Sequence, residues 1–239
     1  MNVIISRNLQ QAKCWATRVF IVGFTFASLL SAGCQLATQS AVDRELREIR
    51  DLLPGVYVGT SVAPWNPGQQ IELTHQFAEI DAPQFGDLVY YYQLLVDGKV
   101  IQQKIFVFDT DAERRENSMG PILLPKNANQ DKAHLFPVNW SKLSPADTKI
   151  FPEQCKLTWK ASLKGASEFF SGPGYSASVD AQACEYESAV FNGTVKPLLR
   201  YDINSATLGW QEKLTDSEGK ILTETSGLLI AQRKQAISD

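Results

Sequence analysis

The chain has 239 residues, of which 44% are hydrophobic and 21% charged, so its composition is that of a folded protein with a sizeable core and not of a disordered chain. The formal net charge of −3 argues against a nucleic-acid-binding protein, because phosphate contacts require a basic surface. Two histidines and four cysteines leave few ligands for a metal centre.

The N-terminus has the pattern of an export signal. Residues 1–33 contain no Asp or Glu, and an uncharged apolar run from Val19 to Leu30 follows Arg18. A run of about a dozen residues is too short to cross the ~30 Å hydrocarbon core of a membrane as a helix, but it suits the hydrophobic segment of a signal peptide. We therefore expect residues 1–33 to be removed during export.

Cys34 is the expected site of lipidation. The small residues Ser31, Ala32 and Gly33 directly before it resemble the cleavage site of a lipoprotein signal peptidase, after which the cysteine would carry the acyl chains. Gln35 follows, in place of the aspartate that often retains bacterial lipoproteins at the inner membrane. We expect an outer membrane lipoprotein that faces the periplasm of a Gram-negative bacterium. A plain signal peptide cut elsewhere, or a short membrane anchor, is the alternative.

The rest of the chain is expected to form one domain. Residues 34–41 are interpreted as a lipidated tether, and residues 42–239 contain no internal repeat and no second domain boundary. Apolar side chains recur at helical spacing over residues 42–53. This spacing predicts a short amphipathic helix that ends before Pro54-Gly55.

Strand patterns follow the helix. From Gln70 to Phe77, apolar and polar residues alternate, with His75 on the apolar face. We interpret His75 as a hydrogen-bonded core histidine and not as a base or metal ligand. Residues 88–96 and 99–108 flank Asp97-Gly98, which predicts a β-hairpin because a type I′ turn requires positive φ angles.

Residues 109–152 contain five prolines and are expected to hold loops and a short helix near residues 144–147. Alternation returns afterwards and predicts strands over residues 155–163, 184–190, 193–202, 206–214 and 221–232. About eight to ten short antiparallel strands predict a mainly β fold, a closed or nearly closed barrel, because closure removes exposed strand edges.

Cys155 and Cys184 have two interpretations. Cys14 lies in the signal segment and Cys34 at the lipid site, which leaves these two, each on the apolar face of its own alternating segment. In an oxidising periplasm such a pair would form a disulfide. The alternative is a reactive thiol that captures an electrophile, which requires a free thiolate of low pKa.

The motifs predict no catalytic residue and no metal site. The sequence lacks the HExxH, Walker, GxGxxG, GxSxG and CxxC patterns. In the run Tyr90-Tyr91-Tyr92, alternation places Tyr90 and Tyr92 on one face and Tyr91 on the other. With Trp159 and Tyr186, these two tyrosines could line a ligand cavity, or they could be ordinary barrel core.

Two short segments and the cysteine pair occur in a recognisable order. Residues 52–57 read LLPGVY, residues 83–93 read PQFGDLVYYYQ, and Cys155 and Cys184 follow. This order resembles the CpcT/CpeT-type phycobiliprotein chromophore lyase family, in which a leucine-rich helix leads to a G-x-[FY] strand and then to a P-x-F-G-x-x-x-Y-x-E-Q segment. The resemblance runs from residue 52 to residue 233. It implies a lipocalin-like ten-stranded barrel that binds an open-chain tetrapyrrole, a bilin, and delivers it to a cysteine of a phycobiliprotein.

The resemblance also implies residues that contact the ligand. Residues 101–104 (IQQK) stand where the family usually has Tyr-Arg-Gln-Arg, so Gln103 keeps the glutamine and Lys104 keeps one positive charge. Together with the aromatic side chains, the candidate ligand-binding residues are Tyr90, Tyr92, Gln93, Gln103, Lys104, Trp159 and Tyr186.

Three functional hypotheses follow. The first is a lipid-anchored, periplasmic, CpcT/CpeT-like barrel protein that binds an apolar or tetrapyrrole-like ligand without clear catalysis. The second is a chromophore lyase that attaches a bilin to a cysteine of an acceptor protein, mainly by proximity and orientation. The third is a structural envelope lipoprotein with a filled barrel. No nucleic-acid partner is expected, and the membrane is expected to be contacted through the N-terminal lipid.

Overall fold

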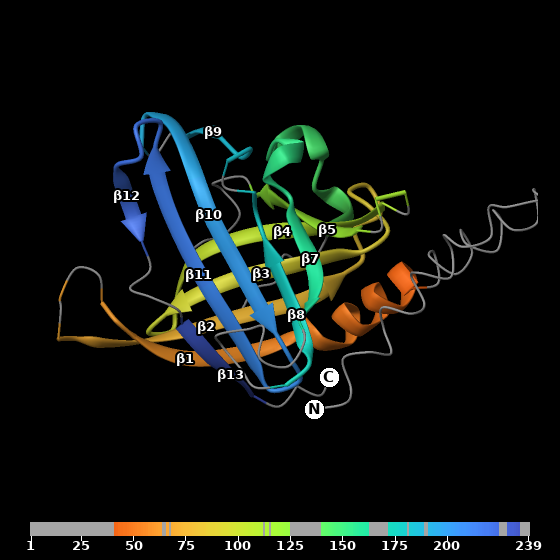
Figure 1. Ribbon diagram of the computed structural model, residues 1–239, viewed down its shortest axis with the longest axis horizontal. Helices are drawn as coiled ribbons and strands as arrows, with labels where there is room; N and C mark the ends of the chain where they lie inside the picture. Colours follow the sequence, from red (N-terminus) through yellow and green to blue (C-terminus); the bar gives the residue numbers. More distant parts are fainter. Residues whose placement is uncertain are drawn as a thin grey trace, which may run out of the picture. The chain divides into compact units, whose positions relative to one another are not determined.

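The computed structural model describes residues 41–63, 66, 68–111, 113–114, 116–124, 140–162, 172–180, 182–188, 191–224 and 229–234, which belong to one compact unit of the chain. The predicted signal peptide, Cys34 and residues 35–40 of the tether lie outside these residues. Residues 41–52 are helical, and the rest consists mainly of strands (Figure 1). Within the described ranges, no helix is both long enough and apolar enough to cross a membrane.

In the described part of the chain, ten strands pair side by side into a closed antiparallel ring. They are β1 (Gly55–Val62), β2 (Gln70–Ile80), β3 (Val89–Val96), β4 (Lys99–Asp111), β5 (Glu116–Leu123), β7 (Leu157–Ser162), β8 (Gly174–Ser178), β10 (Gly193–Ile203), β11 (Thr207–Asp216) and β13 (Leu229–Lys234). The ring closes because β11 pairs with β10 on one edge and with β13 on the other, while β13 also pairs with β1. The predicted mainly β, lipocalin-like barrel with a short N-terminal helix is confirmed.

The predicted helix and hairpin are both present. The helix buries Val42 and Ile49, and the chain enters β1 directly after Pro54. Asp97-Gly98 joins β3 to β4, with φ angles of 47° at Asp97 and 76° at Gly98. Both angles lie in the left-handed region that a type I′ turn requires, and a glycine adopts this region without a Cβ clash.

Two strands occupy segments that were expected to be loops or turns. β5 lies in the proline-rich stretch, and β8 lies in the Gly/Ser-rich stretch between the strands predicted over residues 155–163 and 184–190, where no strand was predicted. Pro121 fits into β5 because its carbonyl oxygen faces away from β4 and accepts a hydrogen bond from the backbone N–H of Phe151 at 3.5 Å. The N–H and C=O of a strand residue point to the same side, so the N–H that proline lacks is not needed for the β4–β5 ladder.

Some strand boundaries also differ from the prediction. Cys155 lies in a 3-10 turn, Glu153–Cys155, so β7 begins only at Leu157. The strand expected over residues 184–190 is limited to β9 (Tyr186–Ser188). The expected strand over residues 221–232 is divided into β12 (Ile221–Glu224) and β13, which pair with different parts of the same edge of β11. The short helix expected near residue 145 is a 3-10 turn, Pro145–Asp147, capped by Ser144.

The barrel wall divides near the disulfide. The free edge of β5 pairs first with β7 and then with β6 (Lys149–Ile150), and the corresponding edge of β10 pairs with β8 and then with β9. β7 and β8 pair with each other, whereas β6 and β9 share no ladder within the described residues. A disulfide joins Cys155 to Cys184 across this division, with Cα atoms 4.7 Å apart. The predicted disulfide is therefore confirmed.

Removing the disulfide with the double substitution Cys155→Ala/Cys184→Ala should lower the free energy of unfolding by about 3–4 kcal/mol, because the bridge closes a loop with a sequence separation of 29 residues. Urea unfolding of the variant, compared with the oxidised and reduced wild-type protein, measures this difference. Equal free energies of unfolding in all three samples would contradict the expectation.

Candidate ligand-binding cavity

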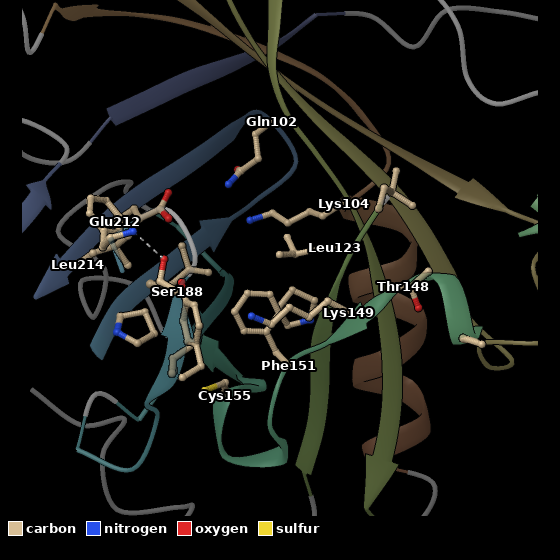
Figure 2. A pocket seen from close by; sticks show the side chains of 18 residues that line it. Gln102, Lys104, Leu123, Thr148, Lys149, Phe151, Cys155, Ser188, Glu212 and Leu214 are labelled. Carbon is tan, nitrogen blue, oxygen red and sulfur yellow. Dashed lines mark hydrogen bonds between the residues drawn. The ribbon is translucent and has the colours of Figure 1, made fainter. Parts of the chain in front are cut away.

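A cavity of about 590 Å³ lies inside the barrel, between β4 and β5 on one side and β10 and β11 on the other. Figure 2 shows side chains from these strands, from β6 and from the 3-10 turns converging on the space. Its lining residues are mostly apolar: Pro121, Leu123, Leu124, Ala146, Phe151, Val179, Phe191, Pro197, Leu199 and Leu214. A volume of this size is within the range that holds one small-molecule ligand.

A layer of aromatic side chains forms the floor of the cavity. The ring of Tyr92 lies 4.8 Å from that of Phe77 and 5.6 Å from that of Phe106. The ring of Tyr201 lies 6.2 Å from that of Phe106 and completes the layer from the opposite wall. Because these buried rings fill the middle of the barrel, the cavity does not continue to the end that the helix covers.

The helix covers the other half of the barrel, where two of the candidate ligand-binding residues lie. Trp159 stacks on Phe108 at 6.1 Å, and Tyr90 packs edge-on against the same ring at 5.4 Å. Asn117, paired with Trp159, donates a hydrogen bond to the carbonyl of Val42 in the helix at 3.2 Å. Tyr90 and Trp159 therefore point into the barrel, as alternation predicts, but they belong to its packed half and do not line the cavity.

Lys104 projects into the cavity just above the aromatic floor. Only 4% of the residue is exposed, and its Nζ lies 5.0 Å from the ring centroid of Tyr92 and 5.1 Å from that of Phe106. Burial lowers the pKa of the Lys104 ammonium, and the charge of Glu212 across the cavity acts in the opposite direction. No ion pair within the described ranges includes Lys104.

The remaining polar groups lie on the wall and at the rim. The buried amide oxygen Oε1 of Gln102 accepts no hydrogen bond from a described residue. At the rim, Lys149 donates a hydrogen bond to the carbonyl of Glu187 at 2.8 Å, and the ring of Tyr186 packs edge-on against Phe151 at 4.6 Å. Tyr186 and Lys104 are thus the candidate residues that line the cavity, while Tyr92 contacts Lys104 from the aromatic layer and is not itself a lining residue.

Gln93 and Gln103 lie on the outer face of the barrel wall, which corrects their assignment to one ligand site with Lys104. The Tyr91 hydroxyl donates a hydrogen bond to Gln93 Oε1 at 3.0 Å and accepts one from Gln103 Nε2. The ring of Tyr91 packs 5.1 Å from that of Trp140 in a second apolar cluster outside the barrel. Residues of the same strand alternate between faces, so the outward position of Gln103 follows from the inward position of Lys104.

Gln102 and Glu212 are cavity residues that the sequence interpretation did not select. Gln102 precedes Lys104 by two positions and therefore shares its face of β4. Glu212 stands between Trp210 and Leu214 on the inward face of β11. The sequence feature that could have identified Glu212 is that it is an acidic residue on an otherwise apolar strand face.

Comparison with known proteins leaves the family open, since no family model matches the chain and no curated protein matches it. Within the described residues, no group of three or more His, Cys, Asp or Glu side chains is placed to hold a metal ion.

His75 lies at the edge of the aromatic floor, as a hydrogen-bonded core histidine. Its Nδ1 is 3.0 Å from the hydroxyl of Tyr92, and its ring is 5.0 Å from that of Trp210. Burial, followed by the charge of Lys104, lowers the pKa of His75 from 6.5 to about 3.

Because the unfolded chain binds a proton at His75 that the folded protein excludes, stability should be lost as pH falls from about 6.5 toward 3. Between pH ~6.5 and ~5, where carboxylates change little, the slope should approach ~1.4 kcal/mol per pH unit. Denaturant unfolding of the wild-type protein and of His75→Asn, which preserves a partner for the Tyr92 hydroxyl, should differ in this slope. Parallel curves would show that His75 titrates normally in the folded protein.

Proposed function

We propose that this protein is a lipid-anchored, periplasmic binding protein whose barrel holds an apolar or tetrapyrrole-like small molecule, with no clear catalysis of its own. The cavity of about 590 Å³ is the observation that carries the proposal. It is enclosed by mostly apolar walls and contains a small number of polar groups, which is the usual character of small-molecule sites. A barrel that served only as an envelope scaffold would have no need for such a space.

The polar groups lie on opposite walls of the cavity, so they would fix the orientation of a bound ligand. Lys104 and Gln102 project from β4, and Glu212 projects from β11 on the opposite wall (Figure 2). The apolar part of a ligand would contact side chains such as Leu123 and Leu199. Burying such contacts contributes about 25 cal/mol per Å² of apolar area.

Filling part of the cavity should weaken ligand binding. Leu199→Trp places a larger side chain in the cavity and should weaken binding at least about tenfold, or ~1.4 kcal/mol. Leu198→Trp is the matched control, because Leu198 is the next residue of β10 and its side chain is 38% exposed on the other face. Both variants and the wild-type protein are titrated with biliverdin, haem and dodecanoate, with absorbance and tryptophan fluorescence as readouts. Absence of saturable binding to all three by the wild-type protein would favour the structural role.

The anchor is a separate part of the proposal and rests on the apolar run and the small residues before Cys34. We expect Cys34→Ser to lose incorporation of labelled palmitate and to move the protein from the outer-membrane fraction to the soluble periplasm. Cys14→Ser is the control, since Cys14 would be removed with the signal peptide, and it should stay in the membrane fraction. A Cys34→Ser protein that is still labelled and membrane-bound would contradict lipidation at this cysteine.

A further inference from the structure

We propose that the cavity is a covalent site for an apolar aldehyde, which Lys104 holds as a Schiff base. The inference rests on the proposed function, because the aldehyde must first occupy the cavity. It adds the chemical class of the ligand and the atom to which the ligand is attached.

The position of Lys104 is the first observation. Figure 2 shows its side chain extending from β4 into the cavity, with the nitrogen at the free end. Since only 4% of the residue is exposed and the rings of Tyr92 and Phe106 lie beside Nζ, the amine is approached through the cavity. A ligand that fills the cavity would therefore bring its polar end to Nζ.

The environment favours the neutral, nucleophilic form of this amine. Aromatic and aliphatic side chains replace the water that would solvate an ammonium group, and this burial lowers the pKa of Lys104. An unprotonated lysine amine in an apolar pocket is the form that attacks carbonyl carbons. The exposed Lys99, on the same strand, remains in water.

Glu212 suits the positively charged iminium that an aldehyde forms with Lys104. Both Glu212 and Lys104 line the cavity, and the charge of Glu212 already acts on Lys104. An aldehyde adds no charge, and the iminium that it forms gains a negative partner in Glu212.

The reaction is a balanced condensation without an oxidant or reductant. The Nζ lone pair forms a bond to the carbonyl carbon, the C=O π pair moves to oxygen, and a proton passes from nitrogen to oxygen to give a carbinolamine. The nitrogen lone pair then forms the C=N bond as hydroxide leaves, and hydroxide takes a proton to become water. When the imine is protonated, the unpartnered Oε1 of Gln102 is an acceptor on the same strand face for its N–H.

The test compares decanal with decanol, which have the same chain and differ in the reactive group. The full chain in a mild detergent is incubated with one equivalent of decanal and cyanoborohydride at neutral pH, and the labelled residue is identified by peptide mass spectrometry. We expect one decyl group, on Lys104 in preference to the exposed Lys99, because burial lowers the pKa of Lys104 and so increases the fraction of neutral amine. Decanol binding is measured by calorimetry.

Substitutions separate attachment from binding. Lys104→Met and Lys104→Arg should lose the label, and near-UV circular dichroism reports that the barrel of each variant is folded. Lys149→Met removes the other lysine that lines the cavity and should retain the label on Lys104. Decanol binding without labelling of Lys104, or labelling of Lys149 instead, would overturn the Schiff base and leave the binding function intact. Failure of the wild-type protein both to bind decanol and to take up decanal would overturn the Schiff base, and it would overturn the proposed function as well if biliverdin, haem and dodecanoate also failed to bind.

Discussion

The pairing of β11 with a neighbour on each edge is the interaction on which the rest of the structure depends. Nine residue pairs join β11 to β10, and β13 pairs with its other edge before it continues to β1. Without this second pairing, the sheet would be open along two edges and its inner face would not be enclosed. Closure of the sheet creates a barrel interior. Because side chains alternate between the two faces of each strand, every second side chain points into that interior.

The inside is filled in layers that can be followed along single strands. In β4, Lys104 belongs to the cavity, Phe106 to the aromatic floor and Phe108 to the half that the helix covers. In β10, Leu199 and Tyr201 take the first two of these positions. Each step of two residues moves one layer along the barrel, so large rings in the middle layer separate a packed half from a hollow one.

Sequence patterns correctly predicted the elements whose formation depends on a single local rule. The Asp97-Gly98 turn and the helix spacing were predicted because turn geometry and periodicity are local properties. β5 was missed because its fit depends on which side of the strand the carbonyl of Pro121 faces, and this is a property of the neighbouring segments. Gln93 and Gln103 were grouped with Lys104 by position in the chain. A register shift between Leu94 and Leu95, which the hairpin turn does not predict, pairs Lys104 with Tyr92 and Gln103 with Gln93. The cavity itself forms between side chains from strands that are far apart in the sequence, so no local pattern predicts that the space is left empty.

The divided wall has a consequence for the exchange of ligand with solvent. Around most of the ring, widening the barrel would require the loss of several backbone hydrogen bonds at once, which is slow and costly. Between β6 and β9 the described residues are joined by the hydrogen bond from Lys149 to Glu187 and by the packing of Phe151 on Tyr186. Fluctuations there can widen the rim while every ladder stays intact. The disulfide at Cys155 and Cys184 limits how far such a widening extends toward β7 and β8, so one covalent bond contributes both to the stability of the barrel and to the extent of the opening.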